Sequence, residues 1–173
     1  PLGARGLIFL PYLMGERSPH LDPVAKGAFV GLTAVHTRRD MIRSVMEGVC
    51  HALHDSMEII QEMGVPVTEV RAGGGGGRSA LWRQMQADMF GVPVKTVQAA
   101  EGPALGVALL AAVGAGAYDT VQQACSAAIS LNQPLCPDPE AGARYQRMHR
   151  IYQALYHALK PSFDAIAAMP ELE

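Results

Sequence analysis

Short apolar runs alternate with longer stretches of helical periodicity along this chain of 173 residues. Three runs are rich in apolar and β-branched residues and have the length of strands, so we predict strands at 6–13, 67–72 and 92–97. The segment 14–36 is rich in Gly, Pro and charged residues, which is typical of a loop. Within it, the apolar triplet at 28–30 predicts one further short strand.

The longest amphipathic pattern begins after Thr37. Thr37 and Asp40 have the spacing of a capping box, and apolar residues follow at helical intervals: Met41, Val45, Val49, Leu53, Met57 and Ile60. Gly64 and Pro66 predict the end of this helix. Arg43 and Glu47 are four residues apart on it, which favours an ion pair on the helix surface.

Further helices are predicted over 80–90, 102–116 and 143–168, the last interrupted at Pro161. Asp119 or Thr120 is expected to cap another helix that runs to about 130, and 132–142 is expected to be a loop. Strands that alternate with helices, without a fixed-period repeat, predict a single α/β domain over 1–173.

The charge pattern limits the partners of this chain. Lys and Arg number 14 and Asp and Glu number 16, for a net charge of −2, and the two signs are interspersed. Nucleic acids and anionic membrane surfaces attract basic stripes, so we predict neither as a partner. No apolar run has transmembrane length and no signal peptide is visible, which predicts a cytoplasmic protein with a small-molecule or protein partner.

Cysteine and histidine spacing indicates no metal site. Cys50, Cys125 and Cys136 form no CxxC pair, which argues against a disulfide framework or a zinc site and fits a reducing compartment. His51 and His54 are three residues apart on the predicted helix. Two ligands alone do not make a zinc site, so we interpret both as surface or satisfied core histidines.

Five consecutive glycines at 73–77 follow a predicted strand and precede Ser79, a candidate helix N-cap. Glycine lets a ligand approach the main chain where a Cβ would clash, and a helix N-terminus offers free N–H groups. No Lys-Ser/Thr pair follows, as it does in a Walker A loop, and no acidic residue follows at the Rossmann spacing. The residues alone leave nucleotide contact and a structural turn equally open.

Two segments carry a resemblance to a known family. GAFVGL at 27–32, seven further residues and DMIRSVME at 40–47 match, position by position, the second signature of the FGGY family of carbohydrate kinases. AGGGGGRS at 72–79 and the helix after it resemble that family's adenosine motif, although relatives usually carry Ala at 77 and an apolar residue at 73. Segment 9–20 resembles the preceding loop of xylulokinases, and 101–108 resembles a small-residue helix of actin-like ATPases.

The resemblance, tightest over 6–115, implies an α/β, actin-like (ribonuclease H-like) domain, the C-terminal half of a two-domain sugar kinase. Such kinases transfer the γ-phosphoryl group of ATP, with Mg²⁺, to a sugar hydroxyl in the cleft between their domains. By matched position, Gly74, Gly75 and Gly76 are expected to lie along the adenosine of ATP or ADP. Ser79 is expected to approach the base, with Arg78 at the border of the same pocket.

In the family, the catalytic Asp and the phosphate loops precede the region matched here. We therefore assign no catalytic residue, and we expect residues 1–173 alone to be inactive. The chain begins at Pro1 and not at Met, so a fragment is expected. The expected sugar is the pentulose D-xylulose, bound mainly by the N-terminal domain, with gluconate, ribulose, fuculose and glycerol as alternatives. A non-catalytic actin-like nucleotide-binding module is the alternative of another class, and a homodimer is left open.

Overall fold

The computed structural model describes residues 1–98 and 102–169, which form two compact units. The first unit consists of Pro1–Val67, Asp88–Gly91 and Pro137–Glu173, and the second of Thr68–Ala87 and Val92–Cys136. The single domain expected over 1–173 stays a prediction. Within 1–98 and 102–169, none of the helices combines the length and apolar character that a membrane span requires.

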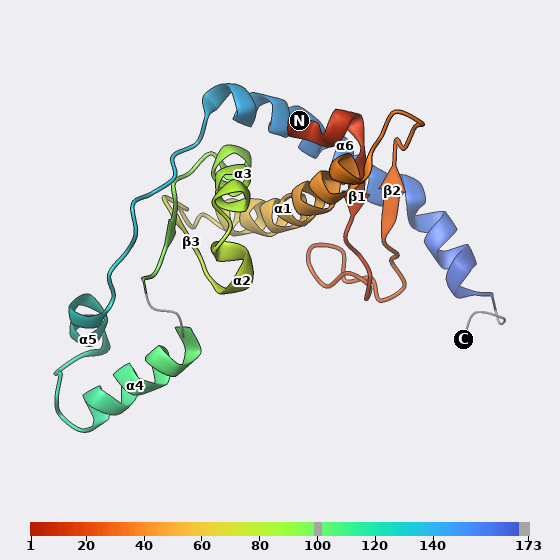
Figure 1. Ribbon diagram of the computed structural model, residues 1–173. Coiled ribbons are helices and arrows are strands. Elements are labelled where there is room, and N and C mark those ends of the chain that lie inside the picture. The colour runs from red at the N-terminus through yellow and green to blue at the C-terminus, as the bar shows by residue number, and fades with distance from the viewer. Residues whose placement is uncertain (99–101, 170–173) are drawn as a thin grey trace. The chain divides into compact units, whose positions relative to one another are not determined.

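In the first unit, the 3-10 helix η1 (Leu2–Gly6) leads into β1 (Ile8–Leu10). β1 pairs antiparallel with β2 (Ala28–Val30; Figure 1). In the register of this pair, Phe9 lies opposite Phe29. All three side chains of β1 are buried, as its apolar run indicated. Both strands lie where the sequence predicted them.

α1 (Arg38–Glu62) begins as predicted from the capping box. The backbone N–H of Thr37 donates to Asp40 Oδ2 over 2.9 Å, and the Thr37 hydroxyl donates to the same oxygen over 2.7 Å. These hydrogen bonds hold the pKa of the Asp40 carboxyl below its ordinary value. Gly48 lets α1 approach β1 closely, because a Cβ there would lie 2.2 Å from the carbonyl oxygen of Phe9.

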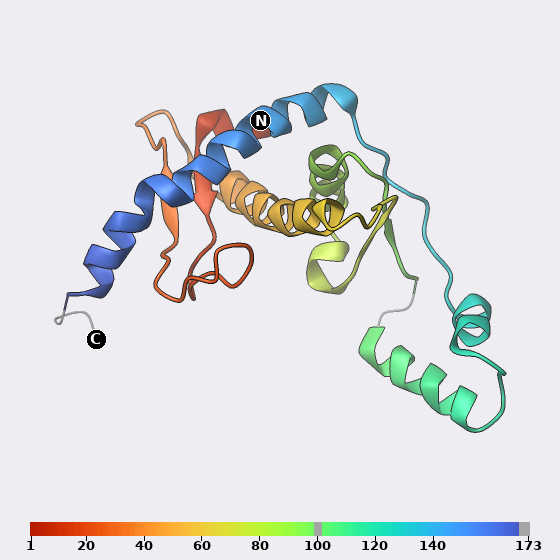
Figure 2. The same cartoon turned by 180° about the vertical axis from the view of Figure 1, so that it is seen from behind.

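α6 (Pro139–Ala167) corrects two expectations. The helix begins before residue 143, because Asp138 Oδ1 accepts from the backbone N–H groups of Glu140 and Ala141 and Pro139 fits the first helical turn. The helix also continues through Pro161, and Figure 2 shows α6 in blue as one element. Buried residues on either side of Pro161, Tyr156 and Phe163, lie in the same core, which offsets the lost helical hydrogen bond.

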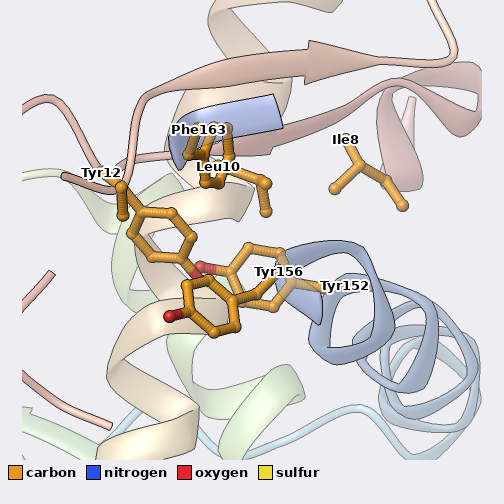
Figure 3. Close-up of a cluster of buried hydrophobic side chains, with 7 residues drawn as sticks. Ile8, Leu10, Tyr12, Tyr152, Tyr156 and Phe163 are labelled. Carbon is orange, nitrogen blue, oxygen red and sulfur yellow. The ribbon is translucent and has the colours of Figure 1, made fainter. Parts of the chain in front are cut away.

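That core joins α6 to β1. Ile8 and Leu10 from β1 and Tyr12 just beyond it pack with aromatic residues of α6 (Figure 3), which are Tyr152, Tyr156 and Phe163. Tyr156 also donates a hydrogen bond over 2.9 Å to the buried carboxylate of Asp22. The tyrosines of α6 therefore pack onto the strands of their own unit.

Glu47 is buried and does not belong to a surface ion pair, contrary to expectation. Its side chain is 2% exposed, and Oε1 accepts from Arg43 Nε over 2.6 Å. The same oxygen accepts from the backbone N–H of Gly3 over 2.9 Å and from the hydroxyl of Tyr145 over 2.9 Å. Because these donors come from η1, α1 and α6, one carboxylate ties three elements together.

His51 and His54 are also buried, and not at the surface. Each leaves one ring nitrogen without a hydrogen-bond partner, Nε2 of His51 and Nδ1 of His54. Burial, together with nearby His149, lowers the pKa of His51 to about 3 and that of His54 to about 4. Both imidazoles are therefore neutral near pH 7.

In the second unit, β3 (Val70–Ala72) pairs parallel with β4 (Val94–Thr96), with Arg71 opposite Lys95. The connection between them holds α2 (Gly74–Gly77) and α3 (Ala80–Phe90), as parallel strands require a crossover. α4 (Gly102–Gly114) and α5 (Val121–Ala128) follow, and Thr120 Oγ1 caps α5 by accepting from the N–H of Gln123. Glu101, the first residue of the small-residue segment, lies outside the described residues.

We predict that Glu47→Gln destabilises the folded chain strongly. The substitution removes the charge that compensates the largely buried Arg43, and breaking such a pair costs about 3–5 kcal/mol of the free energy of unfolding. Urea denaturation measures this loss. The matched control is Glu140→Gln, which breaks an exposed i,i+4 pair with Arg144 and should cost under about 1 kcal/mol. Equal losses for both variants would contradict the role given to Glu47.

Candidate functional site

A cavity of about 1200 Å³ opens in the second unit. That volume exceeds the roughly 300–1,000 Å³ of most small-molecule sites. The wall consists of the glycine run, β4, helices α4 and α5, and the segment after α5. Most side chains at the wall are apolar, among them Leu105, Leu109, Val121, Ile129 and Leu135. An apolar wall with few polar groups is the usual composition of a ligand site.

The glycine run supplies the bare part of this wall. Gly73 is the N-cap of α2, with extended backbone (φ −122, ψ 179), and the next four glycines form a single helical turn. Gly73, Gly74 and Gly75 line the cavity, and a Cβ on any of them would meet no atom of the described residues within 4 Å. Gly74 has φ +66, which strains any other residue. The main chain here is open to a ligand.

The other two glycines pack closely against the protein, although Gly77 also lies at the cavity wall. A Cβ on Gly76 would lie 2.5 Å from the ring of Trp82 in α3, and a Cβ on Gly77 would lie 3.0 Å from the carbonyl oxygen of Ala72 in β3. These close approaches let the turn of α2 fold back between β3 and α3. The run therefore has two sides, one facing the cavity and one facing the protein.

Some of the predicted site residues lie at the cavity wall and others do not. Gly74, Gly75 and Arg78 line the cavity, whereas Gly76 and Ser79 are not among the described residues at its wall. Ser79 instead begins α3, since its hydroxyl accepts from the N–H of Trp82 over 3.3 Å and its carbonyl accepts from the N–H of Arg83 over 3.0 Å. The contacts of all five residues with adenosine stay predictions.

Apart from Arg78, the polar wall residues outside the glycine run had no predicted role. Thr96 Oγ1 accepts from Asn132 Nδ2 over 2.8 Å and lies 3.5 Å from Arg83 Nη1. Arg83 Nε is buried and has no hydrogen-bond partner within residues 1–98 and 102–169. Gln98 and Gln133 complete the polar part of the wall. Arg83 belongs to the segment that resembles the adenosine motif, whereas Asn132 lies in a predicted loop without a motif, so only Arg83 had a signal in the sequence.

The two strands at the site are held together by an ionic contact. Glu69, next to β3, accepts from Lys95 Nζ of β4 over 2.6 Å and from Arg71 Nε over 2.9 Å. The Lys95 and Arg71 hydrogen bonds hold the pKa of the Glu69 carboxyl below its ordinary value. This contact fixes β3 beside β4, from which the glycine run and Thr96 reach the cavity.

Comparison with known proteins assigns the family. The model of the C-terminal domain of the FGGY family of carbohydrate kinases matches residues 1–115. The chain belongs to this family. It is 38% identical over 159 residues to a xylulose kinase of Staphylococcus epidermidis, covering 92% of this chain and 32% of that protein.

Two further comparisons also match this chain to carbohydrate kinases. It is 36% identical over 166 residues to a gluconokinase of Bacillus licheniformis, covering 95% of this chain and 32% of that protein. A crystal structure of a ligand-bound xylulose kinase from Lactobacillus acidophilus matches with a TM-score of 0.88 and 32% identity, covering 96% of this chain and 34% of that one. The chain thus spans about a third of the length of the relatives it matches, and its predicted membership of the family is confirmed.

Neighbouring glycines should respond differently to the same substitution. Gly76→Ala forces the Trp82 ring to move and should lower the free energy of unfolding by about 1–3 kcal/mol. Gly75→Ala meets open space in the same helical turn, so helix propensity should leave stability unchanged or raise it by up to about 1 kcal/mol. Urea denaturation compares the stabilities of the two variants. Indistinguishable stabilities would contradict the claim that Gly76 packs against the protein whereas Gly75 faces open space.

Proposed function

We propose that this chain is the ATP-binding part of a sugar kinase that converts D-xylulose to D-xylulose 5-phosphate, and that it has the actin-like (ribonuclease H-like) fold. The observation that carries the proposal is the cavity beside Gly73, Gly74 and Gly75, where main chain without side chains faces an apolar wall. Membership of a carbohydrate kinase family supplies the reaction class.

The wall chemistry fits a nucleoside. A purine ring is flat, and the bare main chain at Gly73 to Gly75 lets it approach without meeting a Cβ. Leu105 and Leu109 of α4 offer apolar surface. Amide side chains such as Asn132 can give and accept hydrogen bonds at the edge of a base.

The two arginines at the wall, Arg78 and Arg83, suit the phosphates. A guanidinium group binds phosphate oxygens with paired hydrogen bonds, and Arg83 Nε has no partner within the described chain. No Asp or Glu is among the described residues at the wall. Since Mg²⁺ is held by carboxylates and nucleotide phosphates in kinases, the proposal has Mg²⁺ arrive on the phosphates of ATP with its protein ligands outside this wall.

The identity of the sugar rests on likeness. Relatives named xylulose kinase match at 36–40% identity over most of the chain, which supports D-xylulose. The gluconokinase of Bacillus licheniformis at 36% identity makes gluconate the second candidate. In either case we propose that this chain binds the nucleotide. The rest of the kinase then binds the sugar and supplies the general base.

Nucleotide binding tests the proposal at the glycine run. Gly75→Leu places a side chain into the space assigned to adenosine, and we expect ADP affinity to fall at least about tenfold, or about 1.4 kcal/mol. Isothermal titration of the 173-residue chain measures this, with AMP and GDP as further ligands. Because Gly75 has open space around it, the variant should fold as the unmodified chain does.

Gly114→Leu is the matched control, since Gly114 also meets nothing within 4 Å but lies away from the cavity wall. It should keep the affinity of the unmodified chain. Equal ADP affinity in Gly75→Leu and the unmodified chain would contradict the adenosine position that we propose.

Activity forms a separate test. The 173-residue chain should release no ADP in response to D-xylulose or D-gluconate, because no carboxylate at the described wall can take the proton from a sugar hydroxyl. A coupled assay for ADP detects turnover. Sugar-dependent turnover by this chain would contradict the division of labour, and a full-length kinase that prefers D-gluconate would contradict only the choice of sugar.

A further inference from the structure

Histidines and carboxylates from two helices meet inside the first unit, in a place that the proposed kinase function does not use. His54 and Glu58 come from α1 and His149 comes from α6, and one ligand atom of each lies within 4.8 Å of the others. His54 and His149 are buried, and Glu58 is 38% exposed. Asp55, which follows His54 on α1, is buried beside them.

The ring of His149 is oriented by His51. Their Nδ1 atoms lie 3.1 Å apart, so one proton between them serves both rings. With that proton on His149 Nδ1, the lone pair of His149 Nε2 points at two carboxylates, 3.3 Å from Asp55 Oδ1 and 3.4 Å from Glu58 Oε2. Among the residues that the structure describes, Nε2 has no hydrogen-bond partner, although the side chain of His149 is only 4% exposed. In that tautomer a lone pair faces two carboxylate oxygens, an arrangement that a cation bound between them would stabilise.

The spacing of these atoms fits a zinc ion. Two ligand atoms bound tetrahedrally at about 2.0–2.2 Å from Zn²⁺ lie roughly 3.2–3.6 Å from each other. The Nε2 atom of His149 has that spacing to both carboxylates, and Nε2 of His54 is 3.9 Å from Glu58 Oε1. Two imidazole nitrogens with carboxylate oxygens form a donor set that Zn²⁺ prefers.

The carboxylates are themselves held in place. Gln153 Nε2, one turn along α6 from His149, donates to Asp55 Oδ1 over 2.9 Å and to Glu58 Oε2 over 2.8 Å. Partners of this kind orient metal ligands and raise the affinity of the site.

We infer that His54, Glu58 and His149 bind a Zn²⁺ ion that links α1 to α6, with Asp55 beside the fourth position. The ion is structural: it neutralises two carboxylates among buried imidazoles and ties two helices of the first unit. Sequence reasoning excluded such a site because only His51 and His54 are close along the chain, whereas the decisive ligand, His149, comes from another helix.

Zinc titration into the metal-free, tag-free 173-residue chain tests this inference. The background carries Cys125→Ser and Cys136→Ser, because neither thiol is fully buried and both can bind zinc. We expect one Zn²⁺ per chain and a rise in Tm on binding. Glu58→Gln and His149→Gln should each weaken binding more than about 100-fold. Co²⁺ in place of Zn²⁺ should give the visible spectrum of a tetrahedral site, lost in the same variants.

His157→Gln is the matched control, because His157 lies on α6 and is exposed. It should bind zinc as the background chain does. Glu58 is partly exposed, so Glu58→Gln should fold even if His149→Gln does not. A folded background chain that takes up no zinc, or one whose zinc affinity and Co²⁺ spectrum survive Glu58→Gln, would overturn the inference. Neither result would affect the nucleotide proposal.

Discussion

The second unit depends on five residues without side chains between β3 and α3. Because Gly76 and Gly77 have no Cβ, the turn of α2 can pack closely against Trp82 and Ala72. Once the turn is held there, Gly73, Gly74 and Gly75 face the opposite way, into the cavity. One stretch of sequence therefore meets two requirements, close packing on one side and open main chain on the other. Poly-glycine is costly to order, and tertiary packing on Trp82 and Ala72 offsets that cost.

The first unit is organised around buried polar groups as much as around apolar ones. The carboxylate of Glu47 collects donors from η1, α1 and α6, and the tyrosines of α6 close the core over β1. Buried carboxylates and histidines are expensive to desolvate and persist when their partners are fixed. Glu47 of α1 and its partner Tyr145 of α6 form one polar network, and the histidine cluster of the same two helices forms another. The packing of α1 against α6 therefore determines both networks.

Local signals in the sequence predicted most elements and their ends. The Thr37 and Asp40 pair marked the start of α1, and Gly64 and Gly91, both with positive φ, marked the ends of α1 and α3. The predicted loop over 132–142 missed the start of α6, although Asp138 and Pro139 both favour a helix start. Local spacing correctly placed Ser79 as an N-cap.

Features that depend on distant partners could not be predicted in the same way. Spacing paired Glu47 with Arg43, but its burial depends on Gly3 and Tyr145, which no periodicity brings together. Gly76 lies on the protein side of the turn because the Trp82 ring packs against it. Asn132 reaches the cavity from a segment without a motif. The family resemblance predicted an adenosine motif at the glycine run, and only the structure showed which of its glycines line the cavity.

The central claim is that adenosine rests on the uncovered main chain of Gly73, Gly74 and Gly75. A crystal structure of the chain grown with ADP tests it most directly. The account predicts density for the purine ring against these three residues, between them and the apolar side chains of α4. Adenine bound elsewhere on the chain, or the same space filled by the protein's own side chains, would contradict it.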